Sequence, residues 1–213
     1  MILFDHIRRA ELHHSVQNRP EQAQLMVGQV VRYNNNFVNA KKLVDEGAIG
    51  ELTFVESEYA HDYSVARGYN DWRVSPERHA VIGGGCHAVD LLRWLAGDPK
   101  EVFAYGTHRL LPMVDYDDAT IAIMKFSDNL AGKVFVSTGC KRDYTMRTVI
   151  YGTKGTIICD NTSPEITLYE VDEEGVTKEP TKIPVEVNNH NATEEFEVFA
   201  DVIINNKPVV TDA

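Results

Sequence analysis

The spacing of the apolar residues changes from helical to alternating partway along the chain. Apolar positions at helical spacing predict a helix from Asn36 to Glu46, closed by Gly47. A second helix follows the run Gly83–Gly85 and is stopped by Gly97 and Pro99. From about residue 101 the period becomes two, which predicts strands at about 101–108, 118–127, 130–138, 145–151, 155–160, 165–171 and 178–186.

Three further elements flank these. A half-buried strand is predicted at Leu52–Tyr59, and a short β-branched strand at Gln24–Val31. A last helix, about 193–205, begins at Thr193 with acidic residues in its first turn. Its predicted buried face consists of Phe196, Phe199, Ala200 and Ile203.

Consecutive strands with a few flanking helices predict an α+β fold. We expect an open, predominantly antiparallel sheet of six or more strands with helices on one face. Asp128-Asn129 and Lys154-Gly155 indicate hairpins. The strand Ala119–Phe126 is apolar on both sides, so a second domain or a second copy of the chain should cover the free face of the sheet.

The composition of the chain limits the kinds of molecule that it could bind. The 213 residues are 43 % apolar and 25 % charged, with a net charge of −11, which is ordinary for a globular protein but repels nucleic acid and anionic membranes. No apolar run approaches the ~20 residues of a membrane span, and the N-terminus has no signal-peptide pattern. Three cysteines indicate a reducing compartment without a disulfide framework, so we expect a cytoplasmic protein.

The strongest chemical signal is the glycine run that leads into His87. Glycines permit close backbone approach and positive φ, and a histidine in the first turn of a helix binds a proton less readily. Asp90, three residues later, could orient the helix start or the imidazole. On local sequence alone a structural use is favoured, with a tight turn and a histidine that caps or packs.

Other candidates lie at predicted strand ends. His61-Asp62-Tyr63 and Trp72-Arg73 could meet a ligand or simply form a polar loop. Lys141 could contact a substrate, although such a run is more often a solvated turn. Cys86 invites a thiolate interpretation, but adjacent helical residues do not face each other.

Several motifs are absent from the sequence. No Gly-x-Gly-x-x-Gly follows a strand, and there is no Walker-type phosphate loop. No Cys-x-x-Cys occurs and no histidines have metal spacing, so we predict no metal site.

Four segments together resemble the glucose–fructose oxidoreductase/inositol dehydrogenase family (Gfo/Idh/MocA). In order along the chain they are Met26–Tyr33, Lys42–Glu51, Gly83–Trp94 and Val149–Thr156. Members have an N-terminal Rossmann domain and a C-terminal α/β domain with a large open sheet. The resemblance implies a residual segment at 1–24, partly disordered, and a C-terminal substrate and oligomerisation domain at 25–213.

The resemblance also implies roles for individual residues. His87 would be the proton-transfer residue and Asp90 its companion at the helix start. The substrate-side candidates would be Arg32, Tyr63, Trp72 and Lys141. The chain departs from the family in lacking the cofactor fingerprint and the Glu-Lys-Pro segment with its catalytic lysine, and Gly83 stands where the family often has an aspartate.

The resulting hypothesis is the substrate-binding and oligomerisation domain of an NAD(P)-dependent sugar or polyol oxidoreductase. We expect no cofactor in this chain, NAD or NADP in the intact family, a homo-oligomer, and no activity of the chain alone. The alternative is a non-enzymatic domain that dimerises through its sheet. A third hypothesis is a cofactor-free hydrolase or isomerase that uses Cys86 or His87.

Overall fold

The computed structural model describes residues 24–209 and 211. Within them the chain forms two compact units. The larger is Gln29–Ala192, and the smaller combines residues up to Gly28 with residues from Thr193 onward. Residues 1–23 of the predicted N-terminal segment lie outside the described residues, and the predicted domain boundary at residue 25 stays a prediction.

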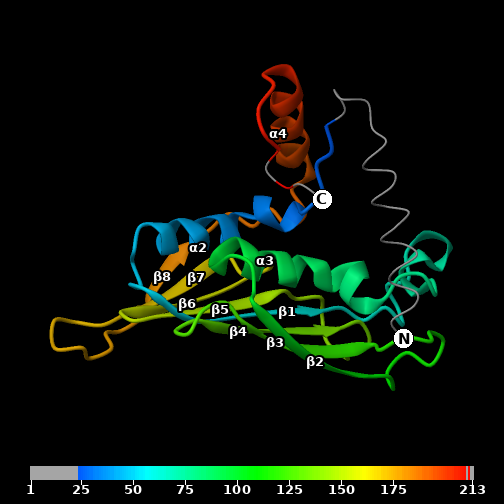
Figure 1. Cartoon of the computed structure of the whole chain (residues 1–213), viewed down its shortest axis with the longest axis horizontal. Coiled ribbons are helices and arrows are strands. Elements are labelled where there is room, and N and C mark those ends of the chain that lie inside the picture. The colour runs from blue at the N-terminus through cyan, green and yellow to red at the C-terminus, as the bar shows by residue number, and fades with distance from the viewer. Residues whose placement is uncertain (1–23, 210, 212–213) are drawn as a thin grey trace. The chain divides into compact units, whose positions relative to one another are not determined.

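The larger unit is built on an eight-stranded sheet, which confirms the predicted α+β class (Figure 1). The strand order is β2-β3-β4-β1-β5-β6-β7-β8. All seven strands predicted after residue 100 are found, together with the earlier one. Their bounds are β1 Leu52–Ala60, β2 Glu101–Thr107, β3 Ala119–Lys125, β4 Ala131–Ser137, β5 Arg147–Gly152, β6 Gly155–Asp160, β7 Glu165–Glu170 and β8 Thr181–Pro184.

Strand β1 divides the sheet into two antiparallel halves. It runs parallel to β4, with Val55 opposite Gly132, and antiparallel to β5, with Val55 opposite Ile150. The sheet is therefore predominantly antiparallel, with one parallel pair, β1 and β4. A strand from earlier in the chain separates β2–β4 from β5–β8, and it contributes the buried residues Val55, Ser57 and Tyr59 to one face.

Two helices cover that face. Helix α2 (Asn35–Asp45) packs on β6 and β7, and helix α3 (Cys86–Ala96) packs on β1 and β4 (Figure 1). The side chain of Asn34 accepts a hydrogen bond from the Asn36 amide at the start of α2. Gly47 and Gly97, with φ of +77° and +83°, follow the two helix ends as predicted.

The glycine run forms a π-helical turn, η3 (Val81–Gly85), that continues directly into α3. Of the two uses that glycine permits, positive φ is not found at these three positions. These glycines instead allow the backbone to approach the sheet closely. A Cβ at Gly84 would lie 2.4 Å from Cζ of Tyr59, and one at Gly85 would lie 2.5 Å from a methyl of Val136. The bare backbone therefore lets the helix start sit directly on β1 and β4.

The predicted strand at Gln24–Val31 is wrong. The described chain there is irregular up to a short 3-10 helix, η1 (Val30–Tyr33). The turn buries Val31 and Tyr33 and leaves Arg32 to reach helix α3. Packing has therefore overridden the β propensity of the valines.

The smaller unit contains helix α4 (Ala192–Ile204), with Glu194 and Glu195 in its first turn as predicted. Its predicted buried face is wrong, because Phe196 and Ile203 are exposed while Glu195 and Val202 are buried. The reason lies within this unit: the Glu195 carboxylate packs against Gly28, 3.3 Å from where a Cβ would stand. No helix in the described ranges has the length and hydropathy needed to cross a bilayer.

Gly84→Ala tests the close approach. We expect a loss of about 1–3 kcal/mol in the free energy of unfolding, because the new methyl would overlap the Tyr59 ring. Urea unfolding of the single variants and of Gly84→Ala/Tyr59→Ala measures it, and the added methyl should cost much less once the ring is gone. Equal costs in both backgrounds would contradict this packing.

Candidate active site

His87 is the second residue of α3 and follows directly after Gly84 and Gly85, which pack against Tyr59 of β1 and Val136 of β4. Its Nδ1 lies 3.1 Å from Oε1 of Gln29, the residue before η1. An amide oxygen can only accept, so this contact places the imidazole proton on Nδ1 and leaves the lone pair on Nε2. No hydrogen-bond partner of Nε2 is found among the described residues. His87 thus presents a free acceptor.

Burial lowers the pKa of His87 from 6.5 to about 4, with smaller contributions from His190 and Arg78 that outweigh the opposing effect of Asp90. The predicted direction is confirmed, but the cause differs from the expected helix terminus. Helical backbone precedes α3 from residue 80, so His87 does not stand at a free end. The imidazole is therefore neutral at neutral pH.

Asp90 lies one turn further along α3 and contacts Arg32. The Arg32 guanidinium donates to both carboxylate oxygens, at 2.7 Å and 2.8 Å. The pair is largely buried, and the Arg32 guanidinium also lies 5.8 Å from the Trp94 ring centroid. In this arrangement Asp90 anchors η1 to α3, and η1 in turn fixes Gln29, the partner of His87. Asp90 and Arg32 are engaged with each other.

Four rings gather where β1 ends, and we call them the ring cluster: His61, Tyr63, Tyr144 and His190. His61 lies 5.1 Å from Tyr63 and 4.6 Å from Tyr144 between ring centroids, and Tyr144 stacks on His190 at 5.6 Å. Beneath them the Tyr59 hydroxyl lies 3.0 Å from that of Tyr63 and 3.2 Å from Nδ1 of His61. The predicted site residue Tyr63 is buried in this network.

The ring cluster carries no charge of its own at neutral pH. Burial is the largest cause that lowers the pKa of His61, followed by the charge of Arg73, and the same two causes lower the pKa of His190. Burial raises the pKa of Tyr144 to about 12 and that of Tyr59 still further. The result is a set of neutral rings with hydroxyl and imidazole groups that can donate or accept hydrogen bonds.

Trp72 lies in the short 3-10 segment η2 (Tyr69–Val74), half exposed, with two guanidinium groups on its ring. The guanidinium carbons of Arg73 and Arg78 lie 4.6 Å and 3.9 Å from the ring centroid. Arg73 also lies 6.0 Å from the Tyr63 ring, which links this group to the ring cluster. The Trp72 ring therefore makes cation–π contacts with two arginines.

Lys141 lies in the connection after β4 and contacts Asp62, the residue that follows His61. Its ammonium donates to Oδ2 of Asp62 at 3.0 Å and to the Ser64 hydroxyl at 3.1 Å. The side chain is otherwise exposed. The structure thus places Lys141 next to the ring cluster, with one carboxylate partner already in place.

Cys86 does not have the environment of a reactive thiolate. Burial raises the pKa of its thiol, which is opposite to what a nucleophile needs. Among the described residues no three His, Cys, Asp or Glu side chains are placed to hold a metal ion. Both observations leave His87 as the acid–base group with the most suitable geometry.

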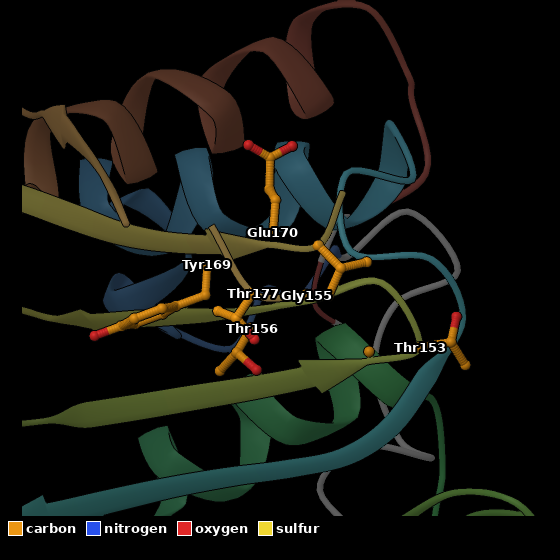
Figure 2. Close-up of a pocket in the computed structure, with 8 residues that line it drawn as sticks. Thr153, Gly155, Thr156, Tyr169, Glu170 and Thr177 are labelled. Atoms are coloured by element: carbon orange, nitrogen blue, oxygen red, sulfur yellow. The ribbon is translucent and has the colours of Figure 1, made fainter. Parts of the chain in front are cut away.

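A shallow hollow lies away from these residues, beside the β5–β6 hairpin and β7 (Figure 2). Its lining offers hydroxyls and one carboxylate but no cation and no imidazole, so it has no acid–base couple. None of the predicted site residues is part of it. The lining residues are Gly152, Thr153, Gly155, Thr156, Tyr169, Glu170, Val171 and Thr177.

Several residues of the site were not singled out as site residues from the sequence. Gln29, Tyr144, His190 and Arg78 come from four separate segments and share no spacing. Only Tyr59 had a usable signal, because it continues the buried alternation of Val55 and Ser57 to the end of β1. Gln29 meets His87 where η1 packs on α3. Tyr144 and His190 reach the end of β1 by tertiary packing. Arg78, by contrast, lies within six residues of Trp72 and Gly83.

The glycine run does not suit a dinucleotide. The positions that a pyrophosphate would need beside Gly84 and Gly85 are filled by the Tyr59 ring and the Val136 side chain. A dinucleotide fingerprint uses bare glycine backbone to approach phosphates, whereas this one approaches protein. The described residues thus provide no nicotinamide cradle of the usual kind.

Comparison with known proteins gives a consistent match. Residues 37–158 match the model of the GFO/IDH/MocA C-terminal domain. The uncharacterized oxidoreductase YhhX of Escherichia coli is 32 % identical over 127 residues, covering 60 % of this chain and 35 % of that protein. Myo-inositol 2-dehydrogenase of Thermotoga maritima is 26 % identical over 158 residues, covering 68 % of this chain and 43 % of that protein.

The fold is also similar to solved structures. A levoglucosan dehydrogenase in complex with NADH and L-sorbose superimposes with a TM-score of 0.76 at 21 % identity, covering 93 % of this chain and 61 % of that one. At that identity the likeness concerns the fold. The chain spans less than half the length of the curated relatives it matches.

The lowered pKa of His87 predicts a pH-dependent stability. Since the unfolded chain binds this proton below pH 6.5 and the folded chain only near pH 4, the contribution of His87 is present above 6.5 and lost as pH falls toward about 4. We expect roughly 2 kcal/mol less unfolding free energy across that window, and a smaller loss in His87→Gln.

Urea unfolding at a series of pH values measures this effect. The matched control is His108→Gln, on the exposed connection after β2, which should keep the wild-type pH dependence. A His87→Gln variant with an unchanged pH dependence would contradict the buried, neutral imidazole.

Proposed function

The chain belongs to the Gfo/Idh/MocA family, and we propose that it is the substrate-binding part of an NAD(P)-dependent sugar or polyol oxidoreductase. The observation that carries this proposal is the geometry of His87. Its Nδ1 is oriented by Gln29 and its Nε2 is unengaged by described residues. It also lies close enough to His190 of the ring cluster for that ring to lower its pKa. Such an imidazole can take the proton of a substrate hydroxyl when that hydroxyl is oxidised, and return it in the reverse direction.

The substrate class follows from the ring cluster and from the relatives. Tyrosine and histidine rings offer apolar faces to the C–H surfaces of a sugar ring, and their hydroxyl and imidazole groups can bond its hydroxyls. Relatives named for inositol and levoglucosan act on molecules of this kind. Tyr63, which belongs to the ring cluster, and Trp72 and Lys141, which lie near it, are the substrate-side residues in this proposal. Arg32 acts one step away, through Asp90.

The coenzyme would have to be held outside the described residues. A nicotinamide would accept the hydride, and some related structures contain NADH. Because the glycine run packs against protein, we propose that the chain alone has no dehydrogenase activity. The three cysteines are free, and we keep the cytoplasm as the proposed location.

A second candidate function, self-association, rests on the uncovered side of the sheet. In the register, Phe103 lies opposite Ile123 and Tyr105 opposite Ile121. Ile123 is opposite Lys133, which is opposite Glu56, so these side chains lie on the face turned away from Val55 and the helices. All four are exposed: Phe103 58 %, Tyr105 69 %, Ile121 42 % and Ile123 56 %. We propose that this apolar patch pairs with a second copy of the chain.

The catalytic proposal is tested by binding and by turnover. Myo-inositol and L-sorbose should bind the chain and perturb the imidazole resonances of His87, and His87→Ala should weaken binding about tenfold or more. His108→Ala is the control and should bind as the wild type does. The chain alone should show no reduction of NAD or NADP with these polyols.

Two outcomes would overturn this proposal. Absence of any polyol binding would remove the substrate site. Turnover by the chain alone that disappears in His87→Ala would show that it holds a coenzyme after all.

Ile123→Lys tests self-association. Sedimentation should show a dimer of the wild-type chain and a monomer of Ile123→Lys, because a buried unpaired ammonium would face the partner's apolar patch. Val176→Lys, which changes an equally exposed valine between β7 and β8, should remain dimeric. A monomeric wild-type chain would exclude this second function.

A further inference from the structure

Two half-buried arginines beside the candidate active site have no carboxylate partner among the described residues. In a chain of net charge −11, the other described arginines except Arg109 lie within 4.0 Å of an Asp or Glu. The paired ones are Arg32, Arg67, Arg93, Arg142 and Arg147. Arg109 is exposed to water. Arg73 and Arg78, which we call the arginine pair, are the exception.

The arginine pair is held in place by groups that carry no negative charge. Both guanidiniums lie on the Trp72 ring, and Arg78 also donates to the carbonyl oxygen of Gly83. The Tyr116 hydroxyl donates to the backbone carbonyl of Arg73 at 3.4 Å, which ties the segment to the core. Nε of Arg78 is buried without a hydrogen-bond partner among the described residues. The two guanidiniums are thus held in place without a carboxylate, and the Nε of Arg78 packs beside Gly83.

Both cations face the catalytic side of the fold. Arg73 lies over the Tyr63 ring and lowers the pKa of His61 and His190, and Arg78 lowers the pKa of His87. Three nearby carboxylates are already engaged: Asp90 by Arg32, Asp62 by Lys141, and Asp118 by the backbone amides of residues 109–111. Asp115 acts with Arg78 on the pKa of Tyr116, but no ion pair joins it to either arginine among the described residues. The arginine pair therefore keeps its charge without a carboxylate partner of its own.

We propose that the substrate carries an anionic group, a carboxylate or a phosphate ester, that the arginine pair binds. The inference rests on the proposed function and specifies its substrate class. A guanidinium removed from water is stabilised by a charged acceptor far better than by a neutral hydroxyl, and its planar fork matches these two oxyanions. A sugar acid or sugar phosphate would then lie with its ring on the ring cluster and one hydroxyl at His87.

Titration calorimetry on the whole chain tests the assignment. Glucuronate and glucose differ only in the carboxylate, and glucose 6-phosphate presents the alternative anion. We expect one of the two anionic sugars to bind at least about tenfold more tightly than glucose, and the preferred one identifies the group. Added salt should reduce that preference.

The variants are Arg73→Gln and Arg78→Gln, with Arg109→Gln as the matched control. Each of the first two should reduce the preference for the anionic sugar about tenfold, and Arg109→Gln should leave it unchanged. Arg73→Lys and Arg78→Lys retain the charge and should recover part of the preference. Thermal unfolding of each variant identifies any that fails to fold, and the lysine variant of the same position then decides.

The possible failures are distinct. If glucose binds as well as glucuronate and glucose 6-phosphate, and the arginine variants behave as the wild type, the anion assignment is wrong while the proposed function stands. If pyrophosphate binds and neither anionic sugar does, the arginine pair serves a coenzyme and the assignment is again wrong. If no sugar binds at all, the proposed function itself fails.

Discussion

The close approach of the glycine run to the sheet is the constraint on which the site depends. Gly84 and Gly85 bring the backbone of η3 against Tyr59 of β1 and Val136 of β4, closer than any side chain would permit. Helix α3 begins directly after that contact, so His87 lies two residues beyond Gly85. The same contact seats the Tyr59 ring whose hydroxyl joins Tyr63 and His61. One steric requirement thus fixes both the imidazole and the rings beside it.

Charge is distributed around this site in two ways. Arg32 and Asp90 satisfy each other through two hydrogen bonds and connect η1 to α3, which makes them structural supports of the Gln29–His87 contact. Arg73 and Arg78 are supported by an indole and by backbone, without a carboxylate partner among the described residues. Burial meanwhile keeps the imidazoles uncharged. A neutral acid–base group between a closed ion pair and an open cationic side is suited to polarised, anionic ligands.

Much of the fold follows from local patterns, whereas the site does not. Alternation located the central strands because one face of each is buried, as in β1 and β4. Gly47 and Gly97 follow the helix ends because the backbone there has a positive φ. The insertion of β1 next to β4 has no local signature, since strand neighbours are chosen by packing over long sequence distances. His87 and Tyr63 could be proposed from their positions, but Gln29, Tyr144 and His190 come from distant segments and meet them only through tertiary packing. The valines of η1 led to the wrong prediction of a strand, because tertiary contacts outweigh β propensity at this position.

The central position of β1 also has a kinetic consequence. Strands β2–β4 and β5–β8 can each form by closing short connections, but β1 meets its parallel neighbour only across residues 61–130. The chain-entropy cost of that closure falls on the strand that joins the two halves, and such non-local pairing slows folding. The residues at the end of β1 therefore come together only when β1 pairs with β4. A partly folded chain would contain parts of the sheet without an assembled site.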